Sequence, residues 1–229
     1  MQELDKIKYE QLIQSIRTKD PEIIADGPVD WSRYVKSKIR ILWILRETNG
    51  GGDWDLREFL TNPFSYKNWH STFGAVAKIS HCFLNDLSPE ELNFNARSVA
   101  DSLKDIAVIN VNKKGGASHI DNNYYKNLKA FINDVKSQIQ ILKPKIIIAA
   151  GTLDQLAMFD DHKEKLNSMP ISAIKLTKKQ WLVKSYHTAQ RSITVRKMYE
   201  MMLLSLEKAD WKKSTNNANS ADAKNRTAD

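Results

Sequence analysis

A chain of 229 residues, 41 % of them hydrophobic, has enough apolar material for one substantial core and is too short for two full-sized domains. No apolar run approaches the roughly 20 residues of a membrane-spanning helix, and the first residues lack the basic-then-apolar order of a secretory signal, so we expect a cytoplasmic protein without membrane contact. The 35 Lys and Arg against 27 Asp and Glu leave a formal charge of +8, which favours a polyanionic partner such as nucleic acid but also suits a surface that is basic for solubility alone.

The predicted elements alternate between helix and strand along the chain. Leucine and isoleucine at helical spacing in the first 14 residues are followed by four short, nearly continuous apolar segments, typical of strands covered on both faces. These predicted strands are Ile39–Leu45, Ile106–Val111, Ile146–Ala150 and Gln180–Tyr186, with Ile171–Leu176 as a possible edge partner of the last.

Helical patterns lie between the strands. A capping-box sequence at Ser88–Glu91 predicts a helix that continues to about Leu103, and an apolar stripe predicts another from Tyr125 to Leu142, before Lys143-Pro144. The alternation predicts an α/β fold, a three-layer α/β/α sandwich with a central, mainly parallel four-stranded sheet. We assign residues 1–211 to this single domain and expect the polar, aperiodic tail 212–229 to be disordered.

Polar residues accumulate where each predicted strand ends. The four carboxyl-terminal segments are Arg46-Glu47-Thr48-Asn49 with three glycines, Asn110 to His119, Gly151-Thr152, and His187 to Ser192. Because the carboxyl ends of parallel strands open on one edge of a sheet, a carboxylate, two asparagines, a histidine and several basic residues should converge there. Taken singly, each has an ordinary alternative: Glu47 as a surface carboxylate or helix cap, Asn110 as a turn residue, and His187 as a structural histidine.

The order of these motifs resembles the uracil-DNA glycosylase superfamily, in particular its mismatch-specific thymine/uracil glycosylases. The similarity runs from about residue 38 to residue 207 through ILWILRETNGG, IAVINVNKKGGAS, LKPKIIIAAGTLDQL and WLVKSYHTAQRS. Each motif is degenerate, and the resemblance rests on four weak matches in the right order.

The resemblance implies roles for individual residues. Glu47 would act beside the sugar C1′, or Asn49 in a shifted register of the first motif, and His187 would serve as the second catalytic group. Asn110, followed closely by Asn112, would read the pyrimidine. An aromatic ring should stack on the flipped base; we take Trp69 as the candidate, although the sequence does not distinguish it from its aromatic neighbours Trp54, Phe64, Tyr66 and Phe73.

DNA contacts are expected from basic and small polar residues around the same motifs. These are Arg46, Lys113, Lys114, Ser118 and Arg191, of which Arg191 occupies the position of the family's wedge residue, with Arg196 nearby. The sequence departs from the family's first motif, because no proline follows Glu47, and from its last motif, in which Thr188, Ala189 and Gln190 replace proline, serine and proline. Where uracil-specific members have a tyrosine that excludes the 5-methyl group of thymine, this sequence has Asn49, so the resemblance does not imply strict uracil specificity.

The predicted activity is that of a monofunctional DNA glycosylase: hydrolysis of the N-glycosidic bond of a flipped pyrimidine, which leaves an abasic site. The sequence leaves the base open among uracil, a mismatched thymine and a 5-modified pyrimidine such as a modified cytosine of phage DNA, and the role open between repair and defence. We expect a monomer acting on double-stranded DNA, with single-stranded DNA as a second option, and with no cofactor and no metal. Two alternatives stay open, namely a non-catalytic nucleic-acid reader on the same fold and a nucleotide-binding hydrolase that uses the Gly50–Gly52 turn.

Overall fold

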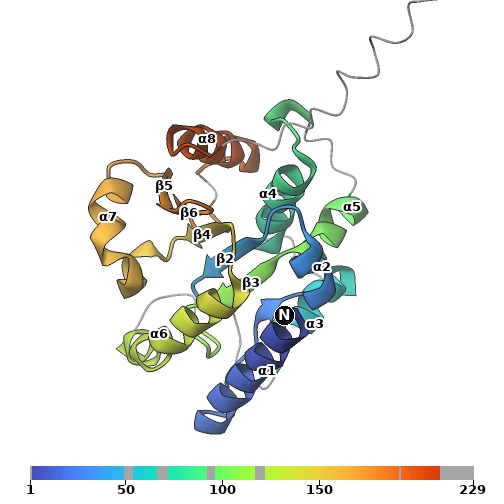
Figure 1. Ribbon diagram of the computed structural model, residues 1–229, viewed down its shortest axis with the longest axis vertical. Helices are drawn as coiled ribbons and strands as arrows, with labels where there is room; N and C mark the ends of the chain where they lie inside the picture. The colour runs from blue at the N-terminus through green and yellow to red at the C-terminus, as the bar shows by residue number, and fades with distance from the viewer. Residues whose placement is uncertain are drawn as a thin grey trace, which may run out of the picture.

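The protein is an α/β fold built on one six-stranded, mostly parallel sheet (Figure 1). The computed structural model describes residues 2–48, 54–65, 72–91, 96–116, 122–190 and 192–211. The strands are β1 (Gly27–Pro28), β2 (Ile41–Leu45), β3 (Ala107–Asn110), β4 (Ile146–Ala150), β5 (Ser172–Thr177) and β6 (Gln180–Ser185), in the order β1-β3-β2-β4-β6-β5.

The four predicted strands form the parallel centre of the sheet, and the expectation of only four strands was wrong. β3, β2, β4 and β6 run parallel to one another, whereas β1 pairs antiparallel with β3 and β5 pairs antiparallel with β6. The segment suggested as an edge partner of the last strand is indeed β5. Two antiparallel edge strands therefore flank the parallel core and make the sheet mixed.

Eight α-helices lie within the described residues, and helices pack on both faces of the sheet. They are α1 (Gln2–Lys19), α2 (Trp31–Lys36), α3 (Leu56–Thr61), α4 (Phe73–Asn85), α5 (Ala96–Asp101), α6 (Asn122–Leu142), α7 (Asp160–Asn167) and α8 (Val195–Lys208). One core cluster holds residues of α3, α4 and α8, and the other holds residues of α1, α6 and α7. Figure 1 shows α4 and α8 above the sheet, with α6 and α1 side by side below it.

The central strands are buried because their side chains feed both clusters in turn. In β2, Ile41, Trp43 and Leu45 belong to one cluster, and the intervening residues belong to the other. The indole Nε1–H of Trp43 donates a hydrogen bond of 2.9 Å to Ser80 Oγ on α4. The polar atom of this large buried side chain is thereby satisfied, which fixes α4 against the sheet.

The predicted helix from Ser88 to Leu103 is only partly reproduced. One half of the capping box forms, since the Ser88 N–H donates to the Glu91 carboxylate at 2.6 Å, but this segment is a short 3-10 turn, Pro89–Glu91. After residues 92–95, which lie outside the described part, the chain continues as α5 and the 3-10 turn Ser102–Asp105. The tail 212–229 also lies outside the described residues. No helix of the described chain is both long and apolar enough to cross a membrane.

Candidate functional site

The strand order places a topological switch point between β2 and β4. The chain leaves β2 toward α3 on one face of the sheet and leaves β4 toward α7 on the other. Neighbouring parallel strands whose outgoing connections diverge in this way open a crevice at their carboxyl ends, where α/β proteins bind ligands. Glu47 follows β2 at this edge, and His187 follows β6, one strand beyond β4. At a spacing of about 4.8 Å per strand, β2 and β6 run about 10 Å apart. The side chains of Glu47 and His187, which follow these strands, are therefore close enough to contact one small ligand from two sides.

The Glu47 carboxylate is held in place by two neighbours. Asn112 Nδ2 donates to Glu47 Oε2 at 2.9 Å, and Arg46 Nε lies 3.3 Å from Glu47 Oε1. The Glu47 side chain is only 4 % exposed, so this carboxylate is not the surface group of the ordinary alternative. A nearly buried carboxylate with fixed partners is oriented before any ligand arrives.

Gly116 makes the position of Glu47 possible. A Cβ atom on Gly116 would overlap the Cδ, Cγ and Oε1 atoms of Glu47, and the Gly116 N–H donates to the Thr48 carbonyl at 2.8 Å. The loop after β3 therefore lies directly against the segment after β2. Glycine is required here for close approach of the backbone to a side chain.

A buried ion pair fixes the loop that carries Asn112. Lys113 Nζ lies 2.7 and 3.0 Å from the two carboxylate oxygens of Asp26 and donates to Gln138 Oε1 at 2.5 Å. The same carboxylate accepts the backbone N–H of Asn110 at 2.7 Å. Desolvation lowers the pKa of Lys113, while the charge of Asp26 opposes that shift. Asp26 thus binds residues on both sides of Asn112, namely the backbone of Asn110 and the side chain of Lys113.

His187 is set in a defined tautomer. The backbone N–H of Ala189 donates to His187 Nδ1 at 3.2 Å, so Nδ1 acts as the acceptor and the neutral ring carries its hydrogen on Nε2. Burial, and then the positive charge of Arg46, lower the pKa of His187, which favours this neutral form. The imidazole therefore presents an Nε2–H donor.

Gly151 allows His187 to lie over the end of β4. Gly151 has φ +69°, and a Cβ there would come within 3.1 Å of His187 Cβ. The next residue, Thr152, turns its hydroxyl onto the Ile44 carbonyl of β2 at 3.0 Å. The strand between the two candidate catalytic residues is thus followed by a residue without a side chain.

Arg46 connects the two halves of the site electrostatically. Its guanidinium contacts the Glu47 carboxylate, and its charge also acts on His187. The charges of Glu47 and Arg46 both act on Tyr124, whose pKa is raised mainly by burial. Arg46, Glu47, His187 and Tyr124 therefore belong to one neighbourhood, although they come from three separate parts of the sequence.

Buried polar atoms without hydrogen-bond partners gather at this edge. Within the described part of the chain, six such atoms lie at or after the ends of the parallel strands: Arg46 Nε, Thr48 Oγ1, Asn110 Oδ1, Gln155 Oε1, Ser185 Oγ and Thr188 Oγ1. A buried polar atom left unpaired costs about 1–3 kcal/mol, so each is rare in a folded protein and calls for a physical reason. A site that binds a polar ligand supplies one.

The structure places Arg46, Glu47 and Asn112 in contact, with His187 within the electrostatic reach of Arg46 and Asn110 at the end of β3. Two assigned roles need correction. The Asn112 side chain is 2 % exposed and binds Glu47 and the backbone N–H of Lys114, so it positions the carboxylate and is not free to read a base. Lys113 is 1 % exposed, and its ammonium group donates hydrogen bonds to Asp26 and Gln138, so it cannot contact a phosphate.

Other predicted residues are occupied elsewhere or not described. Lys114 pairs with Asp20 at 3.0 Å and Glu22 at 2.8 Å, and Arg196 pairs with Glu90 and Glu200. Trp54 packs against Phe59, Phe73 belongs to the core, and Phe64 lines a separate surface hollow with α5. The residues Asn49, Gly50–Gly52, Tyr66, Trp69, Ser118 and Arg191 lie outside the described residues.

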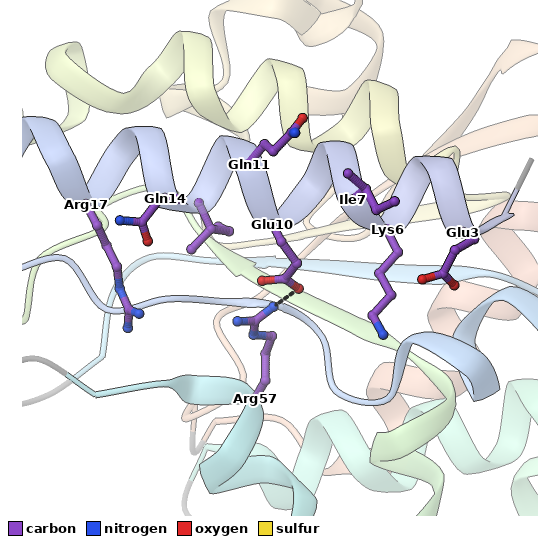
Figure 2. A pocket seen from close by; sticks show the side chains of 9 residues that line it. Glu3, Lys6, Ile7, Glu10, Gln11, Gln14, Arg17 and Arg57 are labelled. Carbon is purple, nitrogen blue, oxygen red and sulfur yellow. Dashed lines mark hydrogen bonds and ion pairs between the residues drawn. The ribbon is translucent and has the colours of Figure 1, made fainter.

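A groove of about 430 Å³ runs along α1 but is a different place. Figure 2 shows Glu10 and Arg57 joined across it, with Lys6, Gln14 and Arg17 along the same helix. Its lining mixes acidic and basic side chains, and the Glu10–Arg57 pair at 2.6 Å already neutralises the two that meet there. No group of three or more metal-ligating side chains occurs among the described residues.

Sequence reasoning missed Asp26, Gly116 and Tyr124 as parts of the site. The Gly115-Gly116 pair was the one local signal, whereas Asp26 lies 87 residues from its partner Lys113 and has no motif of its own. No model of a known protein family matches the sequence, and no curated protein is significantly similar to it. Any function must therefore be argued from the site itself.

Proposed function

We propose that this protein is a monofunctional DNA glycosylase that hydrolyses the N-glycosidic bond of a flipped pyrimidine nucleotide, as a cytoplasmic monomer. The observation that carries the proposal is a fixed, nearly buried Glu47 carboxylate after β2 and a neutral His187 donor after β6, at the carboxyl ends of two parallel strands that flank β4. Helices on both faces of a mostly parallel sheet agree with the three-layer sandwich that the resemblance implies.

The reaction needs two stabilisers of opposite character. As the bond between the base nitrogen and C1′ breaks, the sugar gains oxocarbenium character and the base leaves with negative charge. Glu47 would stabilise the positive sugar and take a proton from the water that attacks C1′. The Nε2–H of His187 would donate to the base oxygen on which negative charge develops.

Asn110 would recognise the base by hydrogen bonds to its edge. Its Oδ1 has no hydrogen-bond partner within the described chain, and its side chain is 2 % exposed at the end of β3. A side-chain amide offers a donor and an acceptor side by side, which matches the paired edge of a pyrimidine. The buried hydroxyls of Thr48, Ser185 and Thr188 leave further polar contacts for a ring substituent.

The proposal is tested on duplexes that each carry one candidate base: uracil opposite guanine, thymine opposite guanine, and 5-hydroxymethylcytosine. After incubation, hot alkali converts abasic sites into strand breaks that are resolved by gel electrophoresis. We expect breaks at one or more of these bases with the wild type, and about 10²–10³-fold slower release with His187→Ala, which removes one developing-charge donor.

A non-catalytic reader is the main alternative. A wild type that binds these duplexes but gives no alkali-sensitive site with any base would support the reader and refute the glycosylase. Release by His187→Ala at the wild-type rate would refute the assigned chemistry even if the protein is a glycosylase.

A further inference from the structure

The exposed side of α6 offers the basic surface that Lys113 and Lys114 do not supply. Lys126, Lys129 and Lys136 are all exposed on this helix, and among the described residues none of them forms an ion pair. The acidic side chain of α6 is Asp134, which is 7 % exposed and lies 3.5 Å from Lys19. Within the described part of the chain, the outer face of α6 therefore carries positive charge without a paired carboxylate.

This surface begins beside the candidate site. Tyr124, in the first turn of α6, is 3 % exposed and lies within the electrostatic reach of Glu47 and Arg46. Tyr125 follows it and is 53 % exposed; the centroids of the two rings lie 5.6 Å apart, and the rings meet edge-on. An exposed aromatic ring thus stands at the rim of the site, where the helix starts.

Helical geometry places these residues along one side of α6. Tyr125 and Lys129 are one turn apart, and Lys136 follows Lys129 by two turns, so the three share a stripe, with Lys126 on its flank. From Lys126 to Lys136 the helix rises about 15 Å, at about 1.5 Å per residue. Successive phosphates of one strand rise by about 3.4 Å along duplex DNA, so the stripe is long enough to follow several of them.

We propose that the α6 stripe, defined as Tyr125, Lys126, Lys129 and Lys136, is the DNA-backbone surface that delivers the target nucleotide to the site. This inference rests on the proposed function. Lys126 and Lys129 contact phosphates next to the target nucleotide, and Lys136 contacts one farther along the strand. Tyr125 stacks on a base left without its partner, because every base has a π-face that an aromatic ring can cover.

A matched control is available at the opposite edge of the sheet. Lys178 and Lys179 lie in the turn between β5 and β6, are exposed, and have no ion pair within the described residues. That turn precedes β6, so it lies at the amino end of the parallel strand, away from the site. Lys178→Gln with Lys179→Gln changes the net charge by the same amount as Lys126→Gln with Lys129→Gln.

The test is a binding titration of a fluorescein-labelled 20-base-pair duplex with a central uracil opposite guanine, repeated from 50 to 200 mM NaCl. The logarithm of the binding constant falls with the logarithm of salt by about 0.9 for each phosphate contact. We expect the slope to become shallower by about two in the Lys126/Lys129 double variant and to stay unchanged in the Lys178/Lys179 variant. Tyr125→Ala should weaken binding with the slope unaltered, because stacking releases no counterion.

Binding and base release separate this inference from the proposed function. An unchanged slope in the Lys126/Lys129 variant, or an equal loss in the Lys178/Lys179 variant, overturns the α6 surface even if the wild type releases a base. A shallower slope together with no base release keeps the surface and refutes the glycosylase. Tighter binding of an RNA duplex of the same sequence overturns DNA as the partner.

Discussion

Replacing Gly116 by alanine tests whether the loop after β3 holds the Glu47 carboxylate in its working position. The added methyl group would occupy space already filled by the Glu47 carboxylate and its Cγ, so either the side chain or the loop must move. The backbone of Gly116 is tied to Thr48 by a hydrogen bond of 2.8 Å, which makes displacement of the side chain the easier response. The hydrogen bond between Asn112 and Glu47 is then lost or lengthened.

Two magnitudes follow from this displacement. Overpacking of a filled site costs about 1–3 kcal/mol of stability, and each kcal/mol lowers Tm by roughly 2–4 °C in a protein of this size. A shift of about 1 Å in a catalytic group can slow a reaction by about 10²-fold. We therefore expect Gly116→Ala to lower Tm modestly and to slow single-turnover base release by up to about 10²-fold.

The stability effect can be assigned by a double-mutant cycle measured by urea unfolding. Glu47→Ala removes the atoms that the new methyl group would meet, so Gly116→Ala should cost almost nothing in that background. If Gly116→Ala destabilises the Glu47→Ala protein as much as the wild type, the methyl group does not act through Glu47. The reasoning about the loop is then wrong.

Two further predictions concern the supports of the site. Asp26→Asn leaves the Lys113 ammonium group buried without its counter-charge, which should cost about 3–5 kcal/mol in urea unfolding; a loss below about 1 kcal/mol would contradict a buried ion pair. The pKa of His187 is lowered from 6.5 by burial and by Arg46, so the ring stays neutral as pH falls to 6.5 and becomes charged only below it. Because protonation puts a hydrogen on Nδ1, opposite the Ala189 N–H, base release should be constant from pH 8 to about 6.5 and decline at lower pH, and a rate that rises as pH falls below 6.5 would refute the neutral-donor assignment.

The sequence predicts the centre of the sheet well because local and tertiary preferences agree there. Ile146–Ala150 was predicted with the boundaries that β4 has, since a β-branched run lies between a Lys-Pro helix stop and a glycine. β1 was not predicted, because it is only two residues long, Gly27 at φ +130° and Pro28, and two residues carry no periodic pattern of hydrophobicity. Edge strands of this length are defined by their partner and not by their own sequence.

The site was predictable in its location but not in the roles of its neighbours. Parallel strands deliver their carboxyl ends to one edge, which is why Glu47 and His187 could be placed there from the order of elements alone. Lys113 and Lys114 are adjacent and identical, yet one is buried against Asp26 and the other reaches Asp20 and Glu22 at the surface. Only tertiary partners distinguish them, and those partners come from the start of the chain, far from any motif.

The most direct test of the central claim is the rate of base release by Glu47→Gln, with Glu164→Gln on α7 as a control that removes the same charge from an exposed position. On a duplex from which the wild type releases a base, we predict that Glu47→Gln binds the DNA with unchanged affinity and releases base at least about 10²-fold more slowly, a loss of the size expected for one electrostatic stabiliser. Glu164→Gln should match the wild type in both measurements. Release by Glu47→Gln at the wild-type rate would contradict the account, because the Glu47 carboxylate would then have no part in the chemistry.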